Sequence, residues 1–349
     1  TGSSLNTNGS TYIFMAFAAD GSTATPSLAN SFATELYTGT GSGSKTVTGV
    51  GFRPDLVWGR SRTGSIGNIL FDVVRGENKQ LSSDNASAEV TRSSAAYEFE
   101  NDGFTVTTAG NLNNSVNYAS WNWKAGGTPS INTDGTITSI VSANQAAGFS
   151  IISYSGNSTA GATIGHGLSS KPELIFIKIL STTADWVAWC NEESTELGYL
   201  SNTDAFDASR YSWALNSTQP TATNITLGNA LSVNTANNYI AYAWHSISGY
   251  SKVGTYTGLG SGGPLTVNMG FAPTLGLIKR TDSTGGWRMF DTVRGTNKSL
   301  QAQEVDAEYV DTYNYMDFTS TGFYFSTSQT NPDINAAGGT YIYLAIKEN

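Results

Sequence analysis

The sequence predicts an all-β protein built from three tandem antiparallel β-sandwich domains of jelly-roll or lectin-like topology. Three observations predict it: a composition rich in Ser, Thr, Asn and Gly, an internal repeat, and apolar runs of strand length separated by turn residues. Charged residues are only 13% of the chain, about half the usual share, so uncharged polar side chains must form most of the surface. These residues disfavour helices and suit short strands joined by tight turns.

Length and charge narrow the classes of function. A chain of 349 residues predicts two or three domains, at roughly 100–200 residues each. The net charge of -9 repels phosphate backbones, so we expect no nucleic-acid partner. The single cysteine, Cys190, allows no internal disulfide, and no run of about 20 apolar residues predicts insertion into a membrane.

The repeat is the strongest signal in the chain. Residues 71–81 (FDVVRGENKQL) recur as 290–300 (FDTVRGTNKSL), with eight of the eleven positions identical. In each copy a proline stands at the start of a predicted strand and a tyrosine begins an aromatic-rich closing run, at a spacing of 64, 67 and 68 residues. The prolines are Pro54, Pro172 and Pro273, and the closing runs are Tyr118–Trp123, Tyr239–Trp244 and Tyr341–Ile346. Nearly constant spacing predicts one domain design used three times, each copy with its own core.

The repeat also sets the expected boundaries. Residues 1–35 hold an orphan closing strand and a linker, 36–127 form repeat 1, 128–148 a hairpin linker, 149–248 a divergent repeat 2 and 249–349 repeat 3. Asp134-Gly135 is a hairpin turn signal in the linker. The N-terminal run Thr11–Ala18 is similar to the end of the chain, so we expect it to be β-paired, in its own chain or in a partner. No stretch combines helical periodicity with a cap.

These motifs resemble a known family. The motifs are Gly51–Trp58, the two Phe-Asp-x-Val-Arg-Gly runs, Tyr118–Gly127, Asp134–Ser139, Gly148–Tyr154 and Gly165–Leu168. They are similar to repeats in tail-fibre-like structural proteins of marine and cyanobacterial bacteriophages. The resemblance implies a virion protein, a tail fibre, spike or surface decoration, located on the virion surface or outside the cell. It implies oligomeric assembly with other virion proteins or copies of itself, and contact with a host surface. The middle copy departs from the pattern at Trp186–Asn191.

The duplicated motif has a structural interpretation. Asp72 with Arg75, and Asp291 with Arg294, each stand at a predicted strand end before a glycine. An ion pair that clamps a turn needs the same chemistry in both copies. We therefore expect these four residues to fix equivalent turns.

Exposed aromatic residues are the candidate ligand-binding residues. Sugar rings stack on Trp and Tyr faces, and Trp186, Trp189, Tyr211 and Trp213 lie in the divergent copy. The alternative is that they fill a core or an inter-domain contact. Host surface polysaccharide is the ligand class that this pattern indicates.

No catalytic or metal-binding residues are predicted, and no cofactor. His166 and His245 are too few for a metal site or a catalytic triad. The acidic cluster of Glu192, Glu193 and Glu196, and the later Asp204 and Asp207, are typical of solvated loops. The leading hypothesis is a non-enzymatic virion structural protein for assembly and host-surface recognition. The alternatives are an array of carbohydrate-binding domains and a polysaccharide-degrading tailspike, which needs a pair of carboxylates.

Overall fold

The computed structural model describes residues 28, 30–64, 66–92, 96–193, 195–311 and 316–348. In this part of the chain the fold is all-β, and every pairing between named strands is antiparallel. The all-β class is therefore confirmed. The expected N-terminal strand, Thr11–Ala18, lies outside the described residues.

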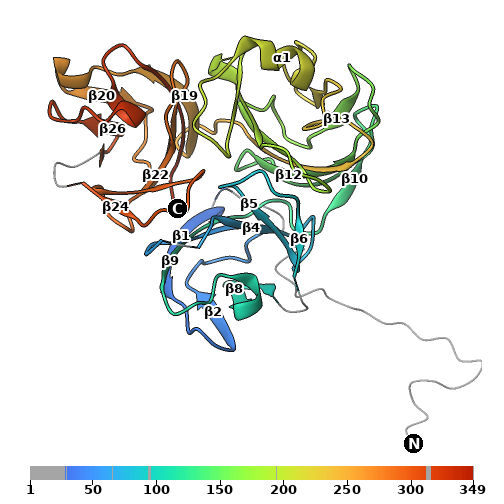
Figure 1. Cartoon of the computed structure of the whole chain (residues 1–349), viewed down its shortest axis with the longest axis horizontal. Coiled ribbons are helices and arrows are strands. Elements are labelled where there is room, and N and C mark those ends of the chain that lie inside the picture. Colours follow the sequence, from blue (N-terminus) through green and yellow to red (C-terminus); the bar gives the residue numbers. More distant parts are fainter. Residues whose placement is uncertain are drawn as a thin grey trace, which may run out of the picture.

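Three units of like topology surround a common centre (Figure 1). We call them unit 1 (residues 32–125), unit 2 (130–245) and unit 3 (251–348). Each has a large sheet near the centre and a small sheet on its outer side.

Unit 1 pairs a six-stranded sheet, in the order β1-β9-β3-β4-β5-β6, with a three-stranded sheet, β2-β8-β7. Its strands are β1 (Phe32–Thr38), β2 (Ser44–Thr48), β3 (Leu56–Ser61), β4 (Ile69–Asp72), β5 (Lys79–Ser82), β6 (Val90–Thr91), β7 (Tyr97–Glu100), β8 (Gly103–Thr107) and β9 (Asn117–Trp123). The expected boundary at residue 36 falls inside β1, whose first residues continue the pairing with β9.

Unit 2 has a seven-stranded sheet, β10-β11-β12-β18-β14-β15-β16, and a two-stranded sheet, β13-β17. Its strands are β10 (Ser130–Asn132), β11 (Ser139–Asn144), β12 (Phe149–Ser155), β13 (Thr163–Gly165), β14 (Leu174–Ile179), β15 (Val187–Cys190), β16 (Leu197–Tyr199), β17 (Asn224–Thr226) and β18 (Asn238–Trp244). The hairpin expected around Asp134-Gly135 is β10-β11, which extends the unit 2 sheet at its edge.

Unit 3 repeats the arrangement of unit 1, with sheets β19-β27-β21-β22-β23-β24 and β20-β26-β25. Its strands are β19 (Ser251–Thr257), β20 (Leu265–Asn268), β21 (Leu275–Arg280), β22 (Trp287–Asp291), β23 (Lys298–Gln301), β24 (Tyr309–Val310), β25 (Asp317–Phe318), β26 (Gly322–Phe325) and β27 (Thr340–Ile346).

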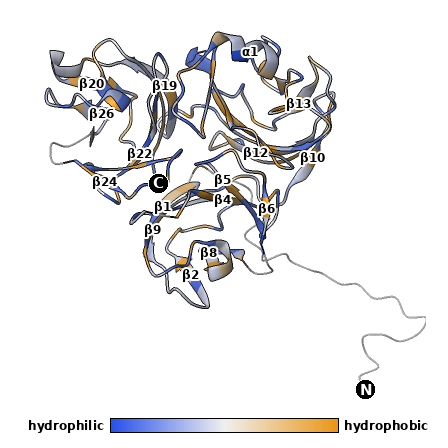
Figure 2. Ribbon diagram, viewed as in Figure 1, coloured by the Kyte–Doolittle hydropathy of each residue, from blue (hydrophilic) through white to orange (hydrophobic). Residues whose placement is uncertain are grey.

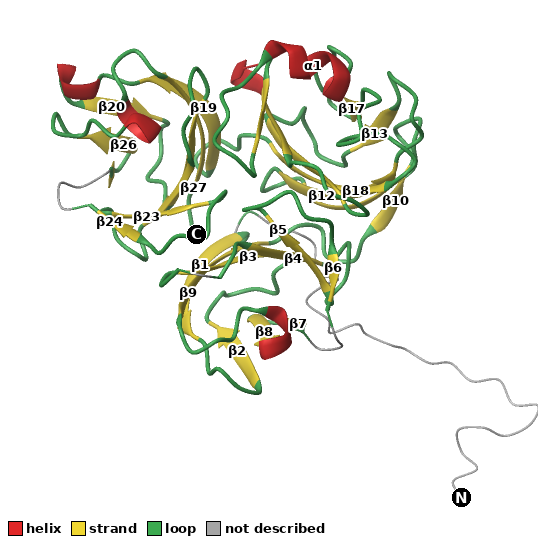
Figure 3. Cartoon of the chain, in the orientation of Figure 1, coloured by secondary structure: helices red, strands yellow, loops and turns green. Residues whose placement is uncertain are grey.

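Helices are short, and one of them corrects the sequence interpretation. Helix α1 (Ala208–Leu215) lies on the outer side of unit 2 (Figure 3). Asp207 caps it by accepting the Ser209 backbone N–H at 2.7 Å, the interaction that an N-cap supplies. Asp207 is thus a helix cap and not part of a solvated acidic loop. The remaining described helical segments are α2 (Pro332–Asn335) and three 3₁₀ turns (Thr108–Gly110, Asn191–Glu193, Gly260–Gly262).

The closing strands explain both the repeat and the position of the core. Each lies between two neighbours in the middle of its sheet and is buried on both faces. Because successive strand residues point to opposite faces, alternate residues reach different cores. In β18, Ile240, Tyr242 and Trp244 join a central core, whereas Tyr239, Ala241 and Ala243 join the core of unit 2 itself.

The central core draws residues from all three units, while each unit also keeps a core of its own. Apolar residues lie on the strands around the centre and also on those of the outer sheets (Figure 2). The expectation of three wholly separate cores is therefore wrong, because one face of each large sheet packs into the same central core. Division of the chain into three independent domains stays a prediction.

Candidate functional site: the unit interfaces and three equivalent grooves

The duplicated Asp–Arg motif occupies the same place in units 1 and 3. Asp72 ends β4 opposite Leu56, and Asp291 ends β22 opposite Leu275. In both units the Arg Nε lies 2.6 Å from the Asp Oδ2, and the pair is almost completely buried. Asp72 Oδ1 accepts the Arg75 backbone N–H at 2.9 Å, and Asp291 Oδ1 accepts that of Arg294 at 2.8 Å. The motif thus clamps a turn in each unit.

The same carboxylates also join neighbouring units. The Tyr242 hydroxyl of unit 2 donates to Asp72 Oδ2 at 2.7 Å, and the Trp121 indole of unit 1 donates to Asp291 Oδ2 at 3.1 Å. Arg294 also lies over the Trp121 ring, 5.2 Å from its centroid. The sequence motif alone did not indicate this second role.

Unit 2 carries an apolar version of the motif. Strand pairing places Cys190 opposite Leu174, where the other units have Asp. The position equivalent to Tyr242 and Trp121 in the closing strand of unit 3 is Leu344. Acceptor and donor are therefore both replaced by apolar groups, which avoids an unpaired buried polar group. Burial raises the pKa of the Cys190 thiol to about 12, so this cysteine is not a reactive thiolate.

One side-chain N–H donor at each of the three unit interfaces links neighbouring units, so that the contacts form a closed ring. One side chain just before or within β4, β15 or β22 donates to a backbone carbonyl of the preceding unit, and unit 1 donates to unit 3. The contacts are Trp186 Nε1 to Ser82 O (2.8 Å), Trp287 Nε1 to Tyr199 O (2.8 Å) and Asn68 Nδ2 to Gln301 O (3.1 Å).

A buried cation accompanies each of these contacts. Arg60, Lys178 and Lys279 each stand four residues after the leucine that begins their strand, β3, β14 and β21 respectively, and all are fully buried. Each donates to the carbonyl six residues later and to one in the preceding unit. The acceptors are Ile66 and Asp306 for Arg60, Ala184 and Ala86 for Lys178, and Gly285 and Thr203 for Lys279. Burial lowers the pKa of Arg60 to about 10 and that of each lysine to about 8.

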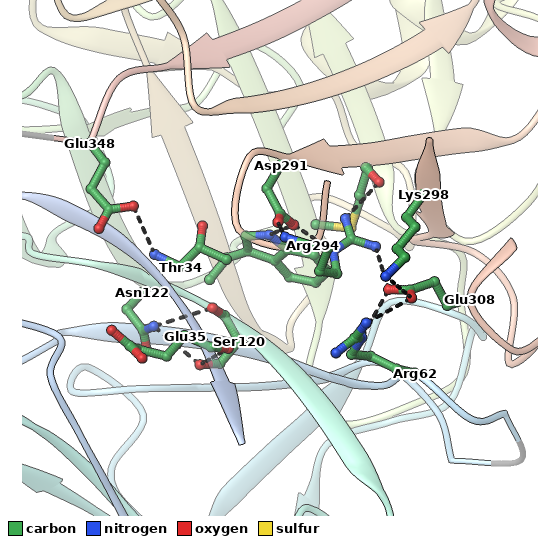
Figure 4. A network of polar contacts seen from close by, with 12 residues as sticks. Thr34, Glu35, Arg62, Ser120, Asn122, Asp291, Arg294, Lys298, Glu308 and Glu348 are labelled. Atoms are coloured by element: carbon green, nitrogen blue, oxygen red, sulfur yellow. Dashed lines mark hydrogen bonds and ion pairs between the residues drawn. The ribbon is translucent and has the colours of Figure 1, made fainter. Parts of the chain in front are cut away.

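The contact between units 1 and 3 is also ionic (Figure 4). Arg62 makes a two-pronged pair with Glu308, with both N–O distances 2.9 Å. Arg294 Nη1 and Lys298 Nζ lie 3.5 and 4.0 Å from the same carboxylate. Two-pronged arginine pairs combine charge with a fixed orientation, so this network holds the first and last units together.

The four aromatic residues predicted to bind a ligand separate into core and surface. Trp186 and Trp189 are 0% and 1% exposed, so neither can stack on a ligand, and their assignment as ligand-binding residues is wrong. Trp186 instead donates its indole N–H across the interface between units 2 and 1. Tyr211, on helix α1, is buried in the unit 2 core. Trp213, on the same helix, is only partly buried and lines a surface groove.

That groove has an equivalent in each of the other two units. All three grooves lie beside the interface donors Asn68, Trp186 and Trp287. Each groove is lined by two residues of its own unit. One directly precedes the donor of that unit, and the other supplies the backbone carbonyl that accepts the donor of the following unit. We call them groove 1, groove 2 and groove 3, with volumes of about 410, 310 and 390 Å³. The two shared positions are Gly67 and Ser82 in groove 1, Asp185 and Tyr199 in groove 2, and Gly286 and Gln301 in groove 3.

The grooves share a position but differ in chemistry. Groove 2 is aromatic and apolar, with Trp213, Tyr199 and the half-exposed Leu231, and has Asp185 and Ser232 at its polar side. Groove 3 contains Arg288, which pairs with Asp333 at 2.6 Å. Groove 1 is lined by Arg92 and Asp84 together with several amide and hydroxyl side chains. The interface contacts recur across the units, whereas the groove linings have diverged.

The histidines and acidic residues are placed in structural roles. His166 is buried and its Nδ1 accepts the Leu168 backbone N–H at 3.1 Å; burial lowers its pKa to about 4. His245 lies 3.5 Å from the Ser169 hydroxyl. Glu193 accepts the Thr281 hydroxyl at 3.1 Å, and Asp204 pairs with Arg210 at 3.1 Å. In the described part of the chain, no three His, Cys, Asp or Glu side chains are grouped to hold a metal ion.

These features define a class: an all-β chain of three interlocked units with a diversified groove on each. The chain belongs to a family defined by a domain of unknown function, DUF7483, whose model matches residues 27–349. The match spans all three units at once. No curated protein and no solved structure matches the chain. Among the described helices, none is both long and apolar enough to cross a membrane.

Proposed function

We propose that the chain is a non-enzymatic structural protein of the outer surface of a bacteriophage particle, a tail fibre, spike or surface decoration, and that it recognises a host-surface polysaccharide. The virion assignment is supported by the resemblance of its repeats to tail-fibre-like proteins. The recognition role is supported by groove 2. The three closed interfaces supply the rigid support that a recognition surface needs.

Groove 2 is the observation that carries the proposal. The Trp213 and Tyr199 rings provide apolar faces for the C–H surface of a sugar, and Asp185 and Ser232 provide polar atoms for its hydroxyls. Arg210 lies 4.4 Å from the Tyr199 ring centroid, and this stacking holds the ring in place. An open site of this kind suits one or two sugar units of a long chain.

The backbone beneath Trp213 is fixed by close packing. A Cβ added to Gly228 would lie 1.9 Å from the Trp213 carbonyl oxygen, so only glycine permits this approach. The Gly228 backbone N–H donates to the Ala214 carbonyl at 2.7 Å. The end of α1 is therefore pinned to the loop that carries Ala230 and Leu231, and the groove is held in one shape.

Binding to purified host-surface polysaccharide tests the proposal. Trp213→Ala should weaken binding by about fivefold, since one aromatic contact contributes about 1 kcal/mol. Trp213→Phe should retain part of the affinity, because it keeps an apolar ring. Ile131→Ala, which alters an exposed side chain outside groove 2, is the matched control and should bind normally.

The same incubation separates binding from depolymerisation. The polysaccharide should keep its chain length, as measured by size-exclusion chromatography. Shortened chains would favour the tailspike alternative, and equal binding by the Trp213→Ala variant would contradict the groove assignment. Labelling of native particles with an antibody against the chain tests its place on the virion.

A further inference from the structure

We propose that groove 1 is a second saccharide site, selective for a sugar that carries a carboxylate. The inference deepens the proposed function, because it assigns an acidic component to the polysaccharide that the protein recognises. It rests on different residues from groove 2. It starts from the chemistry of Arg92.

Arg92 is a cation held by two uncharged side chains, Gln80 and Tyr97. Its Nε donates to Gln80 Oε1 at 2.7 Å, and its backbone N–H donates to the Asn78 carbonyl at 2.8 Å. Gln80 is 4% exposed and also accepts the Tyr97 hydroxyl at 2.7 Å, so the anchor itself is fixed. No carboxylate of the described residues lies within ion-pair distance of Arg92. Because Gln80 and Tyr97 are uncharged, the positive charge of Arg92 is not neutralised, and its remaining N–H groups can donate to a carboxylate.

The remainder of groove 1 suits hydroxyl groups. Asp84 Oδ1 accepts the Asn68 backbone N–H at 2.9 Å and Oδ2 accepts from Asn85 Nδ2 at 3.4 Å, which orients the carboxylate. Oδ2 keeps a further lone pair that can accept a sugar hydroxyl. Asn111, Asn114 and Ser82 add amide and hydroxyl groups along the lining. Asp84 would repel a ligand with several acid groups, so the lining favours one carboxylate on a neutral, hydroxylated frame.

Comparison of the three grooves supports this assignment. In groove 3 the arginine is neutralised by Asp333, and in groove 2 the lining is aromatic. Only groove 1 of the three combines a cation lacking a carboxylate partner with amide and hydroxyl side chains in the described part of the chain. In a protein with net charge -9, a partly buried arginine held in this way points to an anionic group of the ligand.

The experiment uses the full chain and two matched probes. Isothermal titration calorimetry compares a tetrasaccharide of uronic acid with the same tetrasaccharide after reduction of its carboxyls to alcohols; a sulfated neutral tetrasaccharide is the third arm. The variants are Arg92→Gln, Lys45→Gln as a control for the lost charge, and Trp213→Ala. Melting temperatures of all variants check the fold. Glutamine was chosen at position 92 because its side-chain amide can still donate to Gln80.

The proposal expects Arg92→Gln to weaken binding of the uronic tetrasaccharide by about tenfold or more, the loss of a charge-assisted pair. Lys45→Gln should leave that binding within about twofold, and the reduced probe should bind the wild-type chain more weakly. Equal binding of acidic and reduced probes, stronger binding of the sulfated probe, or no effect of Arg92→Gln would overturn the proposal. Failure of the Trp213→Ala variant to affect neutral sugars would count against the groove 2 assignment alone.

Discussion

Each unit interface holds one buried cation, and two of the three, Lys178 and Lys279, make the unfolding free energy vary with pH in the alkaline range. Lys178 and Lys279 have pKa values of about 8 in the folded chain against 10.5 when exposed. Between these values the unfolded chain binds more protons, so rising pH favours the folded state. Above about pH 10 the buried tyrosines act in the opposite direction, because burial raises the pKa of Tyr37, Tyr154 and Tyr256.

We therefore predict that the unfolding free energy rises from pH 8 and passes through a maximum at about pH 10. Urea unfolding at several pH values measures it. The double variant Lys178→Met, Lys279→Met should lose most of the rise between pH 8 and 10. A profile that falls steadily from pH 8 in the wild-type chain would refute the prediction.

Asp291 combines two tasks in one carboxylate, the turn clamp and the contact with Trp121. Asp291→Ala removes the nearest carboxylate of the buried Arg294, leaving only Glu308 at 3.5 Å, and it removes the acceptor of the Trp121 indole N–H. Breaking a buried pair in this way costs about 3–5 kcal/mol, and we expect that loss of stability in chemical denaturation. Cys190→Ala alters the equivalent position of unit 2, where no ion pair exists, and should cost less than about 2 kcal/mol. Similar losses in the two variants would show that the ion pair is not the stabilising feature.

At the scale of the element, helix α1 and the loop that carries Gly228 form one wall of groove 2. Gly228→Ala must displace the loop from the Trp213 carbonyl, and we predict a loss of about 2 kcal/mol or more together with weaker sugar binding. Gly262→Ala is the matched control, because an added Cβ there meets no atom within 4 Å. Normal stability and binding in the Gly228→Ala variant would contradict the prediction.

The strands were predictable from the sequence to a greater extent than the groove. The repeat located the closing strands, and Asp134-Gly135 located the β10-β11 hairpin. Helix α1 was missed because its segment contains Ser and aromatic residues and its cap was interpreted as a loop carboxylate. The groove 2 residues Tyr199, Trp213 and Leu231 come from separate segments, so no local pattern joins them. The buried cations did carry a signal: each stands four residues after an aligned leucine.

At the scale of the whole molecule, aromatic contacts in the shared central core link the folding of the three units. Trp244 lies 6.3 Å from the ring of Trp123 in unit 1 and 5.4 Å from that of Phe176 in unit 2, while Phe176 in turn lies 5.4 Å from Trp287 in unit 3. No unit can lose its large sheet without exposing the central core of the other two. We therefore predict that the three units unfold in one cooperative step.

Hydrogen exchange measured by mass spectrometry can test this unit by unit. Trp244→Ala removes a large side chain that is 3% exposed, and such a change costs about 3–5 kcal/mol. If the units are energetically linked, the slowest-exchanging amides of β9 and β27 lose protection by the same amount as those of β18, because all of them open only with the whole molecule. Ile131→Ala, at a side chain that is 75% exposed, should leave all three units unchanged. Loss of protection limited to unit 2 would instead mean that the units are independent domains, as their sequences suggest, and that the central core holds folded domains together without coupling their unfolding.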